Sequence, residues 1–168
     1  MPLDLDLKLS VDRWLGLPVT VRDTKIVLQA DAQGLHAPLH ATVAGAEVDG
    51  RMHLDTAAPV PTFALELAAQ DLPLGGLARD LAGAGGIEGA VRSVGLRVVG
   101  RGETLGDLAR EIEVSLDATA AQASLARADG ARPITVSIDK LALAAGRKQR
   151  LLGSARGALM GERARLSI

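Results

Sequence analysis

The feature of this sequence that most constrains its fold is an alternation of apolar and polar residues with a period of two. Residues 3–11 place four leucines and a valine at odd positions, while aspartate, lysine and serine fill the even positions. Successive side chains of a β-strand point to opposite faces, so the pattern predicts a half-buried strand with one apolar face.

The same alternation recurs through most of the chain. It is found in residues 19–30, 39–44, 48–55, 63–68, 93–99, 112–117 and 134–143, with a change of phase near residues 23 and 24. Short strands at close spacing, separated by glycine-containing turns, are typical of an antiparallel meander. We therefore predict a mainly β fold, a curved sheet with an apolar, groove-like face, as one domain covering residues 1–168.

Two segments depart from the alternation and predict short helices. Leu74, Leu77, Ala78 and Leu81 recur at helical spacing after Pro73, and a glycine-rich run beginning at Gly83 ends the segment. In residues 104–109, a threonine and an aspartate three residues apart resemble a capping box. For this second segment, a loop with a single helical turn is the alternative.

Composition excludes several classes of function. The 168 residues carry 19 Lys+Arg against 20 Asp+Glu, a formal net charge of -1, which argues against a nucleic-acid partner. Aromatic residues make up 1% of the chain, too few for stacking on bases, sugars or flavins, and cysteine is absent. We expect no cofactor. Neither an apolar run long enough to span a membrane as a helix nor a signal-peptide pattern is present.

Motifs that could carry chemistry have simpler explanations. Residues 83–89 resemble a phosphate-binding loop, but the expected order of elements is helix before and strand after, the reverse of such loops. His36, His40 and His53 lie in alternating segments, where solvent-facing strand histidines explain them better than metal ligands do. The aspartates and serines occupy the polar phase of the strands, without a GxSxG elbow. The basic residues 147–150 fit a solvated hairpin tip, with anionic lipid contact as the alternative. We therefore expect no enzyme, no catalytic residue and no metal site.

What remains is the aliphatic face, for which two interpretations stay open. It could be the sealed core of a structural or protein-interaction β domain. It could instead line a groove for acyl chains, which needs no placed polar residues because burial of each methylene contributes about 0.8 kcal/mol. The candidate lipid-facing residues are Leu3, Leu5, Leu7, Leu9, Ile26, Leu28, Leu39, Val43, Met52, Leu54, Phe63, Leu65, Leu67, Val94, Leu96 and Val98.

Several segments in order along the chain favour the second interpretation. A unit of two strands separated by glycine, L-H-A-T-V-A-G followed by V-D-G-R-M-H-L-D, covers residues 39–55. It is followed by D-L-P-L-G-G-L at 71–77, G-I-E-G at 86–89 and G-R-G-E-T-L-G-D-L-A at 100–109. Together with the paired segments 3–7 and 17–23, this order resembles the C-terminal periplasmic part of AsmA-family proteins.

The resemblance implies a function as well as a fold. AsmA-like proteins are anchored in the inner membrane of Gram-negative bacteria by an N-terminal helix and extend into the periplasm. They are similar to bridge-like lipid-transfer proteins, whose curved β-sheets hold acyl chains, and are linked to phospholipid transport and outer-membrane assembly. The chain lacks the anchor helix, so we interpret it as part of a longer, repeat-built periplasmic protein whose partner is phospholipid or another acyl lipid.

Overall fold

The computed structural model describes residues 5–83, 85–126, 133–146, 149–159 and 162–167. Its strands form one ten-stranded sheet in which spatial order follows chain order from β1 to β10. The strands are β1 (Leu5–Arg13), β2 (Val21–Ala30), β3 (Gly34–Val43), β4 (Ala46–Asp55), β5 (Thr62–Pro73), β6 (Ile87–Arg101), β7 (Glu113–Leu125), β8 (Ile134–Gly146), β9 (Gln149–Leu159) and β10 (Glu162–Ser167).

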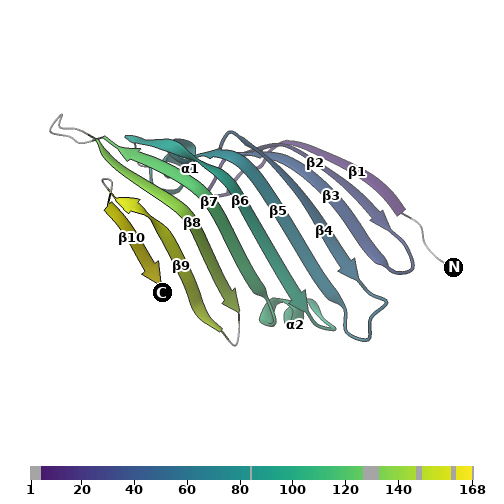
Figure 1. The fold of residues 1–168 in the computed structure, drawn as a ribbon. Helices are drawn as coiled ribbons and strands as arrows, with labels where there is room; N and C mark the ends of the chain where they lie inside the picture. The colour runs from purple at the N-terminus through teal and green to yellow at the C-terminus, as the bar shows by residue number, and fades with distance from the viewer. Residues whose placement is uncertain (1–4, 84, 127–132, 147–148, 160–161, 168) are drawn as a thin grey trace.

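Every neighbouring pair of strands is antiparallel, so the sheet is a meander throughout. The prediction of a mainly β, antiparallel fold is confirmed. Because β1 and β10 are not paired with each other, the sheet is open at both edges (Figure 1).

The hairpin between β3 and β4 shows why the chain turns where it does. Ala44 and Gly45 form its two-residue turn with φ angles of 51° and 93°, the left-handed conformation that tight hairpins need.

Two helical segments lie in connections at opposite ends of the sheet (Figure 1). Helix α1 (Leu74–Ala82) joins β5 to β6, and α2 (Leu105–Arg110) joins β6 to β7. Helix α1 ends at Gly83, which adopts the left-handed conformation typical of helix C-termini. At the start of α2, the Thr104 hydroxyl accepts a hydrogen bond from the Asp107 amide at 3.1 Å, the capping interaction that the sequence indicates.

A row of irregularities crosses four strands at one level of the sheet. In a regular strand, successive positions on one face are two residues apart. On each of these four strands, two successive apolar positions are three residues apart, so one additional residue lies between them. Asp71 and Ala120, two of these additional residues, have φ angles of 51°. Residues at this level have no partner in the ladder, while the register between β5, β6, β7 and β8 is the same on both sides of the row. The paired apolar positions that the row separates are Ala69 and Leu72, Val91 and Val94, Ala118 and Ala121, and Ile138 and Leu141.

The most deeply buried cluster lies at this row. Val91, Ala118 and Ala121 form its centre, and partly buried apolar side chains of β5, α1, β6 and β8 pack against them. The irregularities therefore keep the apolar residues of four strands on one face where simple alternation would have moved them to the other. The sequence shows this change in parity, and the row of irregularities explains it.

Candidate functional site

The strand register places the candidate lipid-facing residues together. Residues that are directly paired across strands share a face, and the pairing runs without interruption from Leu9 on β1 through Ile26, Leu39 and Gly50 to Leu67 on β5. Leu67 is paired in turn with Leu96 on β6. Fifteen of the sixteen candidates lie on this face, which we call the apolar face: Leu5, Leu7, Leu9, Ile26, Leu28, Leu39, Val43, Met52, Leu54, Phe63, Leu65, Leu67, Val94, Leu96 and Val98. Leu3 lies outside the described residues.

Large side chains of the apolar face keep contact with solvent. Leu5, Leu7 and Leu9 on β1 are 47%, 49% and 42% exposed, and the other twelve candidates are half-buried. The buried apolar residues of the described chain are alanines and valines, such as Ala37 and Ala41 of β3. Among the described residues no large side chain is completely buried. In a sealed sandwich or sheet–helix core, such leucines would be inaccessible to water.

Helix α1 closely covers one end of the apolar face. Leu74 of α1 packs against the buried cluster around Val91. Two glycines of α1 allow a close approach: a Cβ on Gly75 would lie 2.8 Å from the Ile87 carbonyl oxygen, and one on Gly76 would lie 2.6 Å from that of Ala44. Helix α1 is thus held between the start of β6 and the β3–β4 turn, at the end of the sheet.

The segment between β1 and β2 is held at the same end by polar contacts that sequence patterns did not indicate. The Trp14 indole N–H donates to the Thr24 hydroxyl at 2.8 Å, and Thr24 is buried beside a bulge at Asp23, whose φ is 50°. The Thr20 amide donates to a carboxylate oxygen of Asp80 in α1 at 2.6 Å. This hydrogen bond, with smaller contributions from the Arg79 and Arg22 charges, lowers the pKa of Asp80 below its ordinary value.

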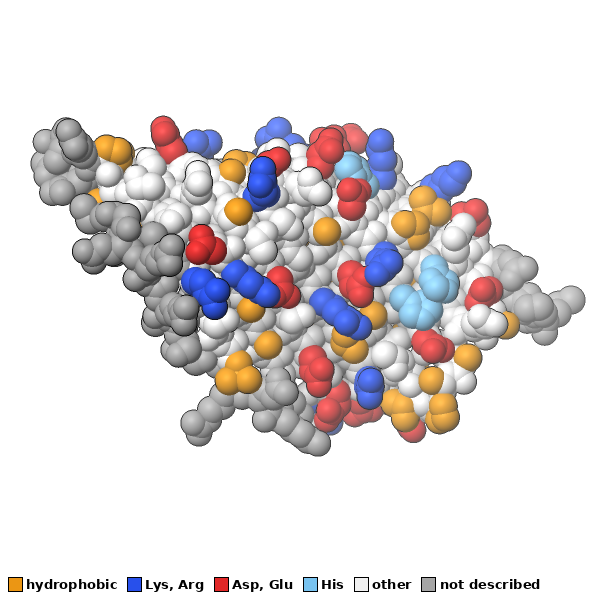
Figure 2. Space-filling model, viewed as in Figure 1, with side chains coloured by type: hydrophobic (Ala, Val, Ile, Leu, Met, Phe, Trp, Pro, Cys, Tyr) orange, Lys and Arg blue, Asp and Glu red, His pale blue; other side chains and the backbone are white. Residues whose placement is uncertain are grey.

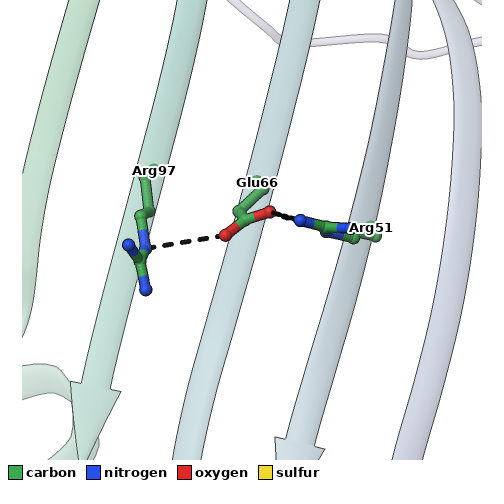
Figure 3. Close-up of polar contacts among 3 residues, drawn as sticks. All are labelled: Arg51, Glu66 and Arg97. Atoms are coloured by element: carbon green, nitrogen blue, oxygen red, sulfur yellow. Dashed lines mark hydrogen bonds and ion pairs between the residues drawn. The ribbon is translucent and has the colours of Figure 1, made fainter.

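The opposite face of the sheet is polar, with acidic and basic side chains interspersed over it (Figure 2). At its centre Glu66 of β5 lies between two arginines (Figure 3). Arg51 of β4 donates through Nε to Glu66 at 2.6 Å, and Arg97 of β6 forms an ion pair with the other carboxylate oxygen at 3.6 Å. Exposed ion pairs of this kind contribute about 0–1 kcal/mol each to the free energy of unfolding. Their main effect is therefore on which residues of neighbouring strands face each other.

A hollow of about 610 Å³ lies on the polar face beside these pairs. Its lining includes Gly95, which has no side chain to fill it, together with Asp49, Arg51, Arg97 and Asp117. Glu66, also in the lining, pairs with both arginines, and together with Asp49 and Asp117 it gives the lining three carboxylates against two guanidinium groups. The hollow therefore offers no excess of positive charge for an anionic group.

The other residues that the sequence offered as candidates are the histidines, which lie on the polar face, and the glycine-rich segment, which lies at one end of the sheet. His36 lies against His53 of the neighbouring strand, whereas His40 lies 2.8 Å from an Asp49 carboxylate oxygen. Within the described ranges, no group of three or more histidine, aspartate or glutamate side chains is arranged to hold a metal ion. The glycine-rich segment follows α1 and precedes β6, the reverse of the phosphate-binding order, as expected. Arg147 and Lys148 lie outside the described residues.

Comparison with models of known families, with curated proteins and with solved structures finds no match to this chain. In the part of the chain that the structure describes, no helix is long and apolar enough to cross a membrane. The resemblance to the AsmA family therefore stays a prediction from the sequence, and the class of protein that the fold defines is an open antiparallel meander with one apolar and one polar face.

Proposed function

We propose that the apolar face forms a groove that shelters the acyl chains of phospholipids or related lipids, and that the chain is a non-enzymatic, lipid-handling segment. The observation that carries the proposal is the partial exposure of large aliphatic side chains over a continuous face of an open sheet. Contiguous apolar surface that stays accessible marks a site for an apolar partner.

Acyl chains fit this face better than a folded protein partner does, because of its chemistry. The sixteen candidate residues are fourteen leucines, isoleucines and valines together with Met52 and Phe63, and their side chains include no hydrogen-bond donor. Protein interfaces typically combine an aromatic and arginine-rich centre with a polar rim. Acyl chains need no directional contacts, and a surface of leucine, valine and isoleucine is sufficient to bind them.

The resemblance to the AsmA family adds a cellular setting to this proposal. In that setting the chain belongs to a periplasmic protein anchored in the inner membrane, and the face guides phospholipid between the inner and outer membranes during outer-membrane biogenesis. A single segment would supply one part of a longer apolar path.

The first experiment is gentle purification followed by native mass spectrometry and lipid extraction. We expect stoichiometric phospholipid on the folded protein. A folded, lipid-free protein that also rejects an added fluorescent phospholipid would overturn the proposal and favour a structural or protein-interaction domain instead.

Charged substitutions then locate the lipid. We expect Leu7→Asp and Leu9→Asp to reduce bound lipid, because each would place a carboxylate against an acyl chain. Both positions are already more than 40% exposed, so the fold should tolerate the change. Ser10→Asp, on the other face of the same strand, is the matched control and should retain lipid. Leu65→Asp and Leu96→Asp extend the test to the half-buried centre of the face, with circular dichroism as the check on folding.

A further inference from the structure

The connection between β1 and β2 carries exposed apolar side chains at one end of the sheet. Residues 14–19 read W-L-G-L-P-V, and the indole N–H of Trp14 is the one polar group among their side chains. Trp14, Leu15 and Leu17 are 40%, 83% and 48% exposed. Single exposed apolar residues are ordinary on a protein surface, but three large ones within four residues indicate an apolar partner. We call residues 14–19 the apolar tip.

Hydrogen bonds hold the apolar tip at both of its ends. At its start, the Trp14 indole N–H donates to the Thr24 hydroxyl. At its end, the Thr20 amide donates to Asp80 of α1, and the Thr20 carbonyl oxygen accepts from the Ala44 amide at 2.9 Å. These contacts fix the base of the tip against the sheet and α1. Because the indole N–H is already paired, contact of the Trp14 ring with an apolar phase leaves no donor without a partner.

The charges at the base of the tip are balanced. They are three adjacent pairs of opposite sign: Asp12 and Arg13 before the tip, Arg22 and Asp23 after it, and Arg79 and Asp80 in α1. The two pairs after the tip lie close enough for the charges of Arg22 and Arg79 to act on Asp80. Since positive and negative charges are equal in number, what the tip offers to a partner is its apolar side chains.

We propose that the apolar tip inserts into the interfacial layer of a lipid bilayer and docks this end of the sheet on the membrane surface. Tryptophan is enriched at the level of the lipid headgroups, and exposed leucines beside it bury apolar area at the boundary with the acyl chains. At that depth the backbone of the tip still reaches water. A folded protein partner fits less well, because a stable protein interface buries about 800 Å² on each side, which is more than a six-residue tip provides. The proposal rests on the exposure of the tip and not on lipid binding by the apolar face.

The test is titration of the whole chain with phosphatidylcholine vesicles, by tryptophan fluorescence and by flotation. Trp14 is the only tryptophan of the chain, so its emission reports on the tip directly. We expect the emission to move to shorter wavelength, phosphatidylcholine with brominated acyl chains to quench it, and the protein to float with the vesicles. Vesicles that also contain phosphatidylglycerol should bind about equally, and added salt should not release the chain, because screening acts on charge and not on apolar burial.

Substitutions at the tip then locate the contact. Leu15→Ser and Leu17→Ser should each weaken vesicle binding about tenfold, since each removes a leucine side chain from the area buried in the bilayer. Val60→Ser is the matched control, because Val60 is also exposed but lies in the β4–β5 connection at the other end of the sheet, and it should bind vesicles as the wild-type chain does. All three side chains are exposed, so the fold should tolerate the changes, and an unchanged Trp14 emission without vesicles checks this.

Three outcomes contradict the proposal. The first is a Trp14 emission that vesicles leave unchanged, and the second is vesicle binding that the Leu15→Ser/Leu17→Ser double variant retains in full. The third is dimerisation without vesicles that the double variant abolishes, which would assign the tip to a contact between two copies of the chain. Lipid binding by the apolar face fails or holds separately: Leu9→Asp should leave vesicle docking unchanged, and Leu15→Ser should leave the lipid that copurifies with the chain unchanged.

Discussion

Two glycines of β6 differ in what a side chain would meet at their positions. A Cβ on Gly89 would lie 1.9 Å from the Gln122 carbonyl oxygen of β7, and Gly89 has a φ of 125°. A Cβ on Gly95 would meet no atom within 4 Å. We expect Gly89→Ala to destabilise the fold by about 2–4 kcal/mol through strain and a broken strand pairing. Gly95→Ala, the matched control, should instead stabilise the fold by about 0.5–1 kcal/mol, because alanine reduces the entropy of the unfolded chain. Urea denaturation measures both, and equal effects would contradict the register of β6 and β7.

Asp80 links the β1–β2 connection to α1 through a pH-dependent contact. The Thr20 amide lowers the pKa of its carboxyl group below the ordinary value of 3.8. A lowered folded-state pKa means that the contact contributes fully above the unfolded-state pKa and is lost as pH falls through the folded-state pKa. We expect the Thr20 amide resonance in NMR to titrate below pH 3.8, and to show no such step in Asp80→Ala. A Thr20 titration that persists in the variant would assign the effect to another group.

At the scale of the elements, the row of irregularities that crosses β5 to β8 carries a cost in backbone strain. Ala120 adopts a φ of 51°, a conformation that costs a residue with a Cβ about 1–2 kcal/mol. We expect Ala120→Gly to stabilise the protein by about 0.5 kcal/mol, since relief of strain exceeds the added entropy of the unfolded chain. Ala123→Gly, in the regular part of the same strand, should destabilise by about 0.5–1 kcal/mol. Thermal unfolding of both variants decides whether their effects have opposite signs.

The alternation of the sequence was sufficient to predict strands β1 to β8, but not β9 and β10, and to indicate which of their residues share a face. Each strand carries its own pattern, and a meander needs only short-range connections to bring neighbours together, so Leu9, Ile26 and Leu39 could be placed on one face without a structure. The change of phase near Asp23 was also visible in the sequence, and the structure shows a bulge there.

Other features depend on pairing that no local pattern encodes. Ala120 has none of the turn chemistry that signals a left-handed residue, and it belongs to a row of irregularities shared with the neighbouring strands. The contact of His36 with His53 depends on the register of one hairpin, in which a shift of one residue would place them on opposite faces. The hydrogen bond from Thr20 to Asp80 joins residues 60 positions apart.

At the scale of the whole molecule, the balance of the two faces decides what the sheet can do. The polar face carries interspersed charges and suits solvent (Figure 2). The apolar face carries aliphatic side chains that stay partly accessible. Ten strands at a spacing of about 4.8 Å make the sheet about 45 Å wide, which gives room for several extended acyl chains. The described helices pack most closely against β6, at the two ends of the sheet, and leave the leucines of β1 exposed.

An acyl-binding face makes a quantitative prediction about chain length. Complete burial of each methylene contributes about 0.8 kcal/mol, and an open sheet covers one side of the chain, so about half of that is expected. Each addition of two methylenes to a fatty acid should then tighten binding by about fourfold, with about fifteenfold as the limit for complete enclosure. Calorimetry with saturated acids from eight to about fourteen carbons measures this slope.

The slope also separates an acyl site from the alternatives. Binding through the carboxylate headgroup alone would give the same affinity for every chain length and would weaken as salt is added, because screening acts on charge and not on apolar burial. Leu9→Asp should lower the affinity for the longest acids most, while Ser10→Asp should follow the wild-type series. A flat series for the wild-type chain would show that the apolar face is closed to acyl chains, and the exposed leucines of β1 would then require a protein partner.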